Sequence, residues 1–163
     1  MCFLFFDRWH VDGFNKGAHS PFTLLVGVAL SAQTVPRCGE LMVHPGAHWQ
    51  LQGAVREHVA NGSATFSRMD EGESEAALNP INGGSADTKP HLGPPVSVLL
   101  QPGDAVLCHQ KLPHLGAHNY SPHVRYQLYF RIAHVALAEH RDRWLDDLLL
   151  PFEGVRAAVD GAP

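Results

Sequence analysis

The sequence carries little charge and contains no long apolar segment. Asp, Glu, Lys and Arg make up 17 % of its 163 residues, the formal net charge is −4, and no run of basic residues occurs. The lack of a basic patch argues against nucleic acid as a partner. The longest apolar stretch, Phe22–Ala32, is interrupted by polar residues. It is also far shorter than the roughly 20 residues that a membrane span requires, so no membrane span is expected.

Cysteine is scarce, and the sequence motifs of several common enzyme classes are missing. Cys2, Cys38 and Cys108 are widely spaced and form no Cys-x-x-Cys pair, which indicates reduced thiols inside a cell. The apolar segment Met1–Phe6 lacks a preceding basic region and is too short for a secretory signal. No nucleophile elbow, phosphate-binding glycine loop or dinucleotide fingerprint is present. We therefore expect an intracellular, cytoplasmic protein, with targeting to an organelle as the open alternative.

Histidine, glycine and proline are abundant instead. The twelve histidines are as many as the lysines and arginines together. Imidazole is both the commonest transition-metal ligand and an acid or base near neutral pH. The 15 glycines and 12 prolines predict many turns between short strands. Hydrophobic residues account for 45 % of the chain, an ordinary value for one globular domain over residues 1–163.

Short apolar segments between turn residues predict an antiparallel β-fold. The clearest strand is Val124–Ile132, whose even positions are apolar and whose odd positions carry polar groups. A short strand is expected over 112–117, and helices over Trp49–Ala60 and Ala138–Leu150, the latter ended by Pro151. The other predicted strands are Phe3–Trp9, Phe22–Ser31, Glu40–His44, Val96–Leu100 and Ala105–His109. Many short strands with little helix favour a β-sandwich or jelly roll.

His10 and Asp12 form the first candidate metal pair. They stand two residues apart after the predicted strand Phe3–Trp9, and side chains at i and i+2 of an extended segment point to the same face. Both can therefore reach one ion; the alternative is an Asp that caps a turn beside a packed His. A second His-x-Asp pair, His140 and Asp142, falls in the predicted C-terminal helix. Side chains two positions apart in a helix point about 200° from each other, so we interpret this pair as surface residues.

Three further motifs follow in order along the chain. Residues 39–48 read Gly-Glu-Leu-Met-Val-His-Pro-Gly-Ala-His, and residues 101–109 begin with Gln-Pro-Gly-Asp before an apolar strand. His114 is then followed by Asn119 five residues later and by Arg125 eleven residues later.

Together with the Trp-His-Val-Asp motif, this order and spacing resembles the phytanoyl-CoA dioxygenase-like family of iron(II)- and 2-oxoglutarate-dependent oxygenases, over residues 9–131. The resemblance implies a double-stranded β-helix, or jelly roll, with a C-terminal helix. It implies that His10, Asp12 and His114 hold iron(II), a ligand set that leaves three coordination positions open. Arg125 would bind the distal carboxylate of 2-oxoglutarate, because a planar guanidinium binds a carboxylate bidentately.

Other residues receive supporting roles from the same resemblance. Asn119 and Gln127 are minor candidates for binding the cosubstrate. Trp9, His48 and His109 are candidates for the rim of the pocket or for supporting the ligands. No residue other than the metal ligands is assigned a catalytic role.

The resemblance implies an oxidoreductase that hydroxylates a small or lipid-like organic substrate. The enzyme would use O₂ and oxidatively decarboxylate 2-oxoglutarate, and ascorbate would support its activity. Asp12 favours hydroxylation, because related halogenases lack this carboxylate. A coenzyme A thioester is not implied, and the polar loop 62–95, a variable insertion, would shape the substrate pocket. Two alternatives stay open: a non-catalytic jelly roll that binds metal or ligand, and a cupin-like metal enzyme that does not use 2-oxoglutarate. Arg125 distinguishes both alternatives from the oxygenase, because a site without a keto-acid cosubstrate has no need of this arginine.

The position of the first motif predicts a shortened domain. Only eight residues precede Trp9, whereas members of this family usually place helices and the first barrel strand before the motif. The seven predicted strands are one fewer than a jelly roll contains. We therefore expect an N-terminally truncated domain that leaves an unpaired strand edge beside Phe3–Trp9.

Overall fold

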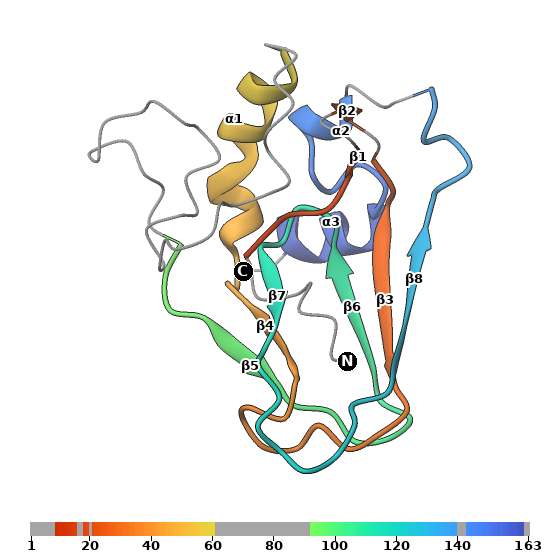
Figure 1. Ribbon diagram of the computed structural model, residues 1–163. Helices are drawn as coiled ribbons and strands as arrows, with labels where there is room; N and C mark the ends of the chain where they lie inside the picture. The colour runs from red at the N-terminus through yellow and green to blue at the C-terminus, as the bar shows by residue number, and fades with distance from the viewer. Residues whose placement is uncertain (1–8, 16–17, 20, 61–91, 140–142, 162–163) are drawn as a thin grey trace, which may run out of the picture.

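The structure is a computed structural model that describes residues 9–15, 18–19, 21–60, 92–139 and 143–161, coloured in Figure 1. Its strands are β1 (Phe14–Asn15), β2 (Ala18–His19), β3 (Leu24–Ala29), β4 (Leu41–Val43), β5 (Val96–Val98), β6 (Ala105–His109), β7 (His114–Gly116) and β8 (Gln127–Ile132). Its helices are α1 (Ala47–Ala60), α2 (Arg143–Asp146) and α3 (Glu153–Asp160). None of these helices is long and apolar enough to cross a membrane.

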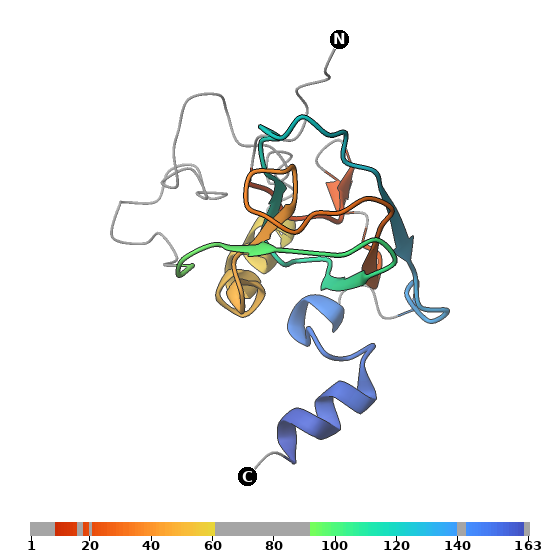
Figure 2. The same ribbon diagram turned by 90° about the horizontal axis from the view of Figure 1, so that it is seen from below.

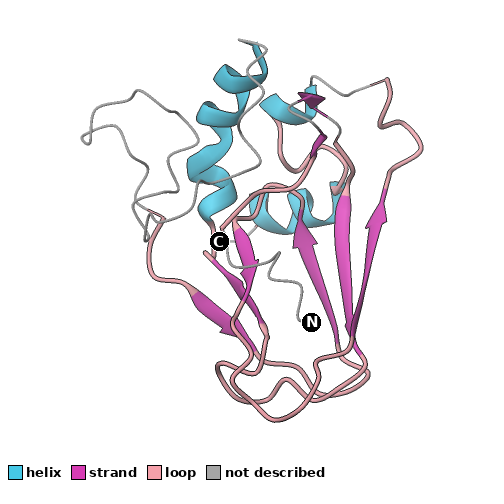
Figure 3. Ribbon diagram, in the orientation of Figure 1, coloured by secondary structure: helices cyan, strands magenta, loops and turns pink. Residues whose placement is uncertain are grey.

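Two three-stranded antiparallel sheets form most of the β-structure, with strand orders β6-β3-β8 and β5-β4-β7. Strands β1 and β2 form a separate small pair. Figure 3 shows the two larger sheets as separate groups of strands, joined by loops at the lower end of the view. The fold is therefore a β-rich one of small antiparallel sheets, as the many short predicted strands indicated.

The core between the two sheets is apolar and draws on both of them. The alternation of β3 buries Leu25, Gly27 and Ala29 on one face, as expected for a strand with one face inward. The shared core consists of Phe22, Leu25, Leu41, Val43 and Cys108, with Val98, Val106 and Leu112 packed against it. Burial of these side chains supplies the main driving force that holds the sheets together.

Helix α1 packs against the N-terminal segment and forms a second core. Its buried residues Ala47, Leu51 and Val55 are spaced four apart, so they lie on one face of the helix. They contact Val11 and Leu92, and Trp9 packs against the same cluster. The helix thereby fixes the segment that carries the first two candidate metal ligands.

Strand β8 has the two faces that the sequence predicts, and its polar residues lie on the side of the sheet that β3 buries, with Tyr129 40 % exposed. Gln127, Tyr129 and Arg131 lie opposite the buried Ala29, Gly27 and Leu25 of β3. The apolar face carries Leu128, Phe130 and Ile132, which are 47 %, 50 % and 48 % exposed. Within the described residues, β8 pairs only with β3 and forms an open edge of its sheet. The predicted edge beside Phe3–Trp9 lies outside the described residues, apart from Trp9 itself.

The C-terminal helix prediction was wrong in its extent. Of the predicted span Ala138–Leu150, only α2 is helical among the described residues, and a further helix, α3, follows Pro151. Asp147 accepts the backbone N–H of Leu149 with its side chain, a local bond that competes with helix continuation. Proline then fits just before a new helix, where its missing N–H is not needed. Figure 2 shows α2 and α3 as separate segments at one side of the sheets.

The other predicted elements agree with the structure or lie outside it. The predicted helix Trp49–Ala60 is α1, which begins two residues earlier, and the short strand expected over 112–117 is β7. The predicted strands within the described residues correspond to β3, β4, β5, β6 and β8. Residues 62–91 of the expected loop, and the His140–Asp142 pair, lie outside the described residues.

Candidate metal centre

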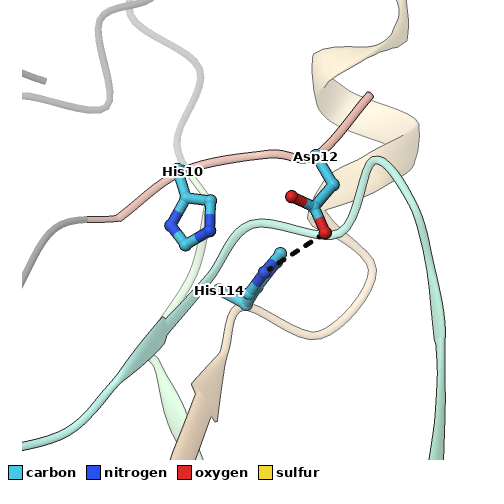
Figure 4. Close-up of side chains that lie close together, drawn as sticks. All are labelled: His10, Asp12 and His114. Carbon is cyan, nitrogen blue, oxygen red and sulfur yellow. Dashed lines mark ion pairs between the residues drawn. The ribbon is translucent and has the colours of Figure 1, made fainter. Parts of the chain in front are cut away.

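His10, Asp12 and His114 come together from opposite parts of the chain, as Figure 4 shows. Each offers one ligand atom, and these three atoms all lie within 4.8 Å of one another. The Nε2 atom of His114 is 3.9 Å from Oδ2 of Asp12. Asp12 and His114 are buried, and His10 is half-buried. The three residues that the sequence predicts as metal ligands are therefore neighbours in the fold.

Backbone hydrogen bonds hold the two histidines in register. The His10 N–H donates to the His114 carbonyl at 3.1 Å, and the His114 N–H donates to the His10 carbonyl at 3.0 Å. The N-terminal segment thus extends the sheet beside β7 as an antiparallel bridge. Side chains alternate along this extended segment, so Val11 points into the α1 core while His10 and Asp12 face His114.

The orientation of the His114 ring suits a neutral metal ligand. Its Nδ1 lies 2.8 Å from the Leu112 carbonyl oxygen, which assigns the ring proton to Nδ1 and leaves a lone pair on Nε2 facing Asp12. Burial lowers the pKa of His114, and the neighbouring His10 lowers it further, while the Leu112 carbonyl and Asp12 act in the opposite direction. The neutral form, which binds metals, is the one that this environment favours.

Asp12 is held at its backbone and at its side chain. Its N–H donates to the Gln110 carbonyl, and its carbonyl accepts a bond of 3.1 Å from Lys111 Nζ. Its Oδ1 accepts a bond of 3.1 Å from Arg131 Nη2. Lys111 and Arg131 were not among the predicted site residues. The only sequence signal for Arg131 is its place on the polar side of the Val124–Ile132 alternation, and Lys111 has none, because its partner is a backbone carbonyl far away in sequence.

Lys111 is a buried lysine beside the candidate ligands. It is 2 % exposed, and burial lowers its pKa to about 7, with Asp12 acting in the opposite direction. Gly13 makes this approach possible. Gly13 adopts a positive φ of 88°, and a Cβ there would lie 2.7 Å from Lys111 Nζ. A glycine after the His-x-Asp motif therefore has a packing reason as well as a conformational one.

Arg125 lies two residues before β8 and is half-buried. Its Nη1 donates to the Gly39 carbonyl, and its guanidinium carbon is 5.9 Å from the centre of the Tyr129 ring. Within the described residues we find no contact between Arg125 and the three candidate ligands. Its predicted role in binding 2-oxoglutarate stays a prediction.

Two glutamines have buried side-chain amides that lack hydrogen-bond partners among the described residues. Both amide atoms of Gln33 and of Gln127 are buried and unpaired, and Gln33 is fully buried. Gln127 lies on the polar face of β8, as does Tyr129. Buried amides of this kind are costly unless something hydrogen-bonds to them, so water or a polar ligand is expected to reach them.

Asn119 is occupied by a local turn. Its amide nitrogen donates to the His123 carbonyl at 2.8 Å. Its amide oxygen accepts bonds from the backbone N–H and the hydroxyl of Ser121. Asn119 is exposed, and the structure does not bring it into contact with the candidate ligands; its predicted role in binding the cosubstrate is untested.

Trp9, His48 and His109 lie beside other aromatic groups. The Trp9 ring is 4.1 Å from the His44 ring, and the rings of His48 and His109 stack at 5.2 Å. His109 also contacts the Leu148 carbonyl, and burial, together with His48, lowers its pKa to about 4. The described contacts of these three residues do not include the candidate ligands, so their supporting roles stay predictions.

The donor set fits a divalent transition metal. Two imidazoles and one carboxylate on one side of an ion form the set that non-haem iron(II) uses, with other positions left open. His114 also has the hydrogen bond to a carbonyl that metal-ligating histidines usually make through their second nitrogen. No protein-family model, curated protein or solved structure matches this chain.

Proposed function

We propose that the chain is an iron(II)- and 2-oxoglutarate-dependent dioxygenase that hydroxylates a small or lipid-like organic substrate. The observation that carries the proposal is the convergence of His10, Asp12 and His114, whose ligand atoms lie within 4.8 Å of one another. The order and spacing of the sequence motifs support the same family. Iron(II) held by these residues would supply the activation of O₂ that hydroxylation of a C–H bond needs.

We also propose that the two larger sheets are the halves of a jelly roll. In support of this, the chain passes repeatedly between them: β3, β6 and β8 belong to one sheet, and β4, β5 and β7 to the other. Apolar side chains from both sheets share one core. A jelly roll consists of two such antiparallel sheets packed face to face.

The residues of the chain would have separate tasks at this site. His114 presents Nε2 because Leu112 fixes its other nitrogen, and Asp12 presents Oδ2 because Arg131 holds Oδ1. Arg125, whose guanidinium has five N–H donors and bonds to the Gly39 carbonyl, would bind the distal carboxylate of 2-oxoglutarate. The unpaired amide of Gln127, on the same face of β8 as Arg131, would offer a further hydrogen bond to a polar cosubstrate.

One assay tests the activity. Succinate released from 2-oxoglutarate, in the presence of iron(II) and ascorbate, is measured for the wild type, His114→Ala and Arg125→Ala. We expect turnover above background in the wild type alone. Equal background release from all three proteins would overturn the proposed oxygenase activity.

A second candidate is a metal-binding protein or enzyme that does not use 2-oxoglutarate. It is favoured by the contact between Arg125 and the Gly39 carbonyl, away from the candidate ligands. Calorimetry of 2-oxoglutarate binding to the Co²⁺-loaded protein separates the two. The oxygenase requires binding that Arg125→Ala weakens while Co²⁺ stays bound, and the second candidate requires no such binding.

A further inference from the structure

Arg131 stands beside Asp12 in a way that links it to the metal site. We infer that Arg131 is a positioning residue that balances the charge of Asp12 when no metal is bound and lowers the affinity of the site for a divalent cation. This inference rests on the proposed metal site. Arg131 is not one of the candidate ligands, but it would control how tightly those ligands bind their ion.

The two oxygens of the Asp12 carboxylate have different neighbours. Oδ1 accepts the bond from Arg131 Nη2 at 3.1 Å, and Oδ2 faces His114 Nε2 at 3.9 Å. The guanidinium therefore leaves free the oxygen that points toward the other ligand atoms. An ion could be bound by Oδ2 while Arg131 still holds Oδ1, so carboxylate, guanidinium and metal would share one small region.

The surroundings hold Arg131 in this position. It lies on the polar side of β8, in register with the buried Leu25 of β3, and its guanidinium carbon is 5.4 Å from the centre of the Phe22 ring. Phe22 is itself buried and anchored by a bond from its N–H to the Gln110 side chain. A cation stacked on a fixed aromatic ring is directed as well as attracted.

A second basic side chain, Lys111, also lies beside Asp12. Lys111 Nζ donates to the backbone carbonyl of Asp12 at 3.1 Å. Arg131 Nη2 donates to the carboxylate itself, at Oδ1.

The charges determine the direction of the effect. Without metal, removal of Arg131 takes away the guanidinium that bonds to Oδ1 of a buried carboxylate, which destabilises the fold. With metal, the ion itself balances Asp12, and removal of Arg131 also removes repulsion between two cations. Arg131 therefore stabilises the metal-free protein and destabilises the metal-bound one. By linkage, a substitution that removes its charge should lower the stability of the metal-free protein and tighten metal binding. The Arg131 side chain is 66 % exposed, so solvent keeps the effect modest.

The test uses Co²⁺ binding and thermal unfolding of Arg131→Gln, which removes the charge. We expect the Tm of the metal-free variant to fall by about 2–4 °C and its Kd for Co²⁺ to tighten by roughly fivefold. Saturating Co²⁺ should bring the Tm of the variant back toward that of the Co²⁺-loaded wild type. Calorimetry and the visible absorption of Co²⁺ measure binding. The Co²⁺ binding that remains in Asp12→Ala measures the contribution of other histidines.

Two variants serve as controls. Arg131→Lys keeps the charge and should bind Co²⁺ with nearly the wild-type Kd. Arg56→Gln breaks an ion pair with Asp146 whose partners are both more than half exposed, and it should leave the Kd unchanged.

The possible failures are distinguishable. If the wild type binds no more Co²⁺ than Asp12→Ala, both the metal site and the role of Arg131 are overturned. If the wild type binds Co²⁺ at the site but Arg131→Gln binds it equally well or more weakly, the metal site stands and the role of Arg131 is wrong.

Discussion

At the scale of single residues, Glu40 is a carboxylate with an unusually complete set of donors. It is buried and accepts the backbone N–H groups of Arg37 and Cys38 and the hydroxyl of Ser97. Burial raises the pKa of Glu40, but these hydrogen bonds together outweigh burial, so its pKa is lowered from the usual value of 4.5. The ionised side chain therefore stabilises the turn that leads into β4.

We predict that Glu40→Gln lowers the free energy of unfolding at pH 7 by about 1–3 kcal/mol. Because the folded pKa lies below the unfolded one, the contribution of Glu40 is complete above pH 4.5 and is lost as the pH falls through the folded pKa. Urea unfolding of both proteins between pH 7 and pH 3 measures this. The difference between them should shrink on acidification, and a difference independent of pH would contradict the assignment.

The candidate ligands could be predicted at this scale, whereas their supporting residues could not. His10 and Asp12 are two residues apart, and their common face follows from the period of an extended chain. His114 was implied by the family resemblance, whose motif places an Asn five residues and an Arg eleven residues after the histidine. Arg131 and Lys111 reach Asp12 from distant parts of the sequence, and only the folded arrangement of β8 and the segment before β7 brings them there.

At the scale of single elements, β3 depends on a glycine in its middle. A Cβ at Gly27 would lie 2.7 Å from Gln127 Nε2, 2.9 Å from Tyr129 Cε1 and 3.0 Å from Val106 Cγ1. Side chains from both neighbouring strands therefore occupy the volume that a side chain at Gly27 would need.

We predict that Gly27→Ala destabilises the protein by about 1–3 kcal/mol through this overpacking. Gly53 is the matched control, because it lies inside α1 and a Cβ there has no atom within 4 Å. Gly53→Ala should stabilise the protein by about 0.5–1 kcal/mol, since alanine favours the helix. Urea denaturation measures both. Equal and small effects from the two substitutions would show that the side chains over Gly27 can move aside.

The two faces of β8 could be predicted, but the direction in which each points could not. Alternation is a property of the strand, whereas the inward face is decided by what lies across the sheet and beneath it. The polar face of β8 lies on the side of the sheet that carries the buried residues of β3, and its Arg131 reaches Asp12. The α2 and α3 region escaped prediction for a similar reason, since the bond from the Asp147 side chain to Leu149 is local and invisible to helical periodicity.

At the scale of the whole molecule, the outer face of the β6-β3-β8 sheet is apolar. Leu107 of β6 is 66 % exposed and shares a row with Val26 of β3 and Phe130 of β8. Exposed apolar surface next to an open strand edge favours association.

We predict that Phe130→Thr changes the free energy of unfolding by less than about 1 kcal/mol, because threonine suits a strand and little burial is lost. It should also reduce self-association, measured by light scattering against protein concentration. Leu25→Ala, on the buried side of the same sheet, is the contrast and should cost about 2–5 kcal/mol. Losses of stability of the same size from both variants would mean that the outer face is covered in solution.

Overall architecture was predictable as a class and not as an arrangement. Turn residues at short intervals indicated many short strands, and β3 to β8 lie where those segments were expected. The order β6-β3-β8 places β3 between strands that come much later in the chain. Such pairing depends on which faces can be buried together, and no local pattern reports it.

The reciprocal backbone bonds between His10 and His114 join two distant parts of the chain, and an ion at this site would reinforce that connection. They close a loop that runs from residue 10 to residue 114 and contains β3, β4, β5 and β6. An ion bound at both ends of that loop would act as a removable staple. Like a disulfide, it would restrict the freedom of the unfolded chain, and such a restriction counts for more when the enclosed loop is long.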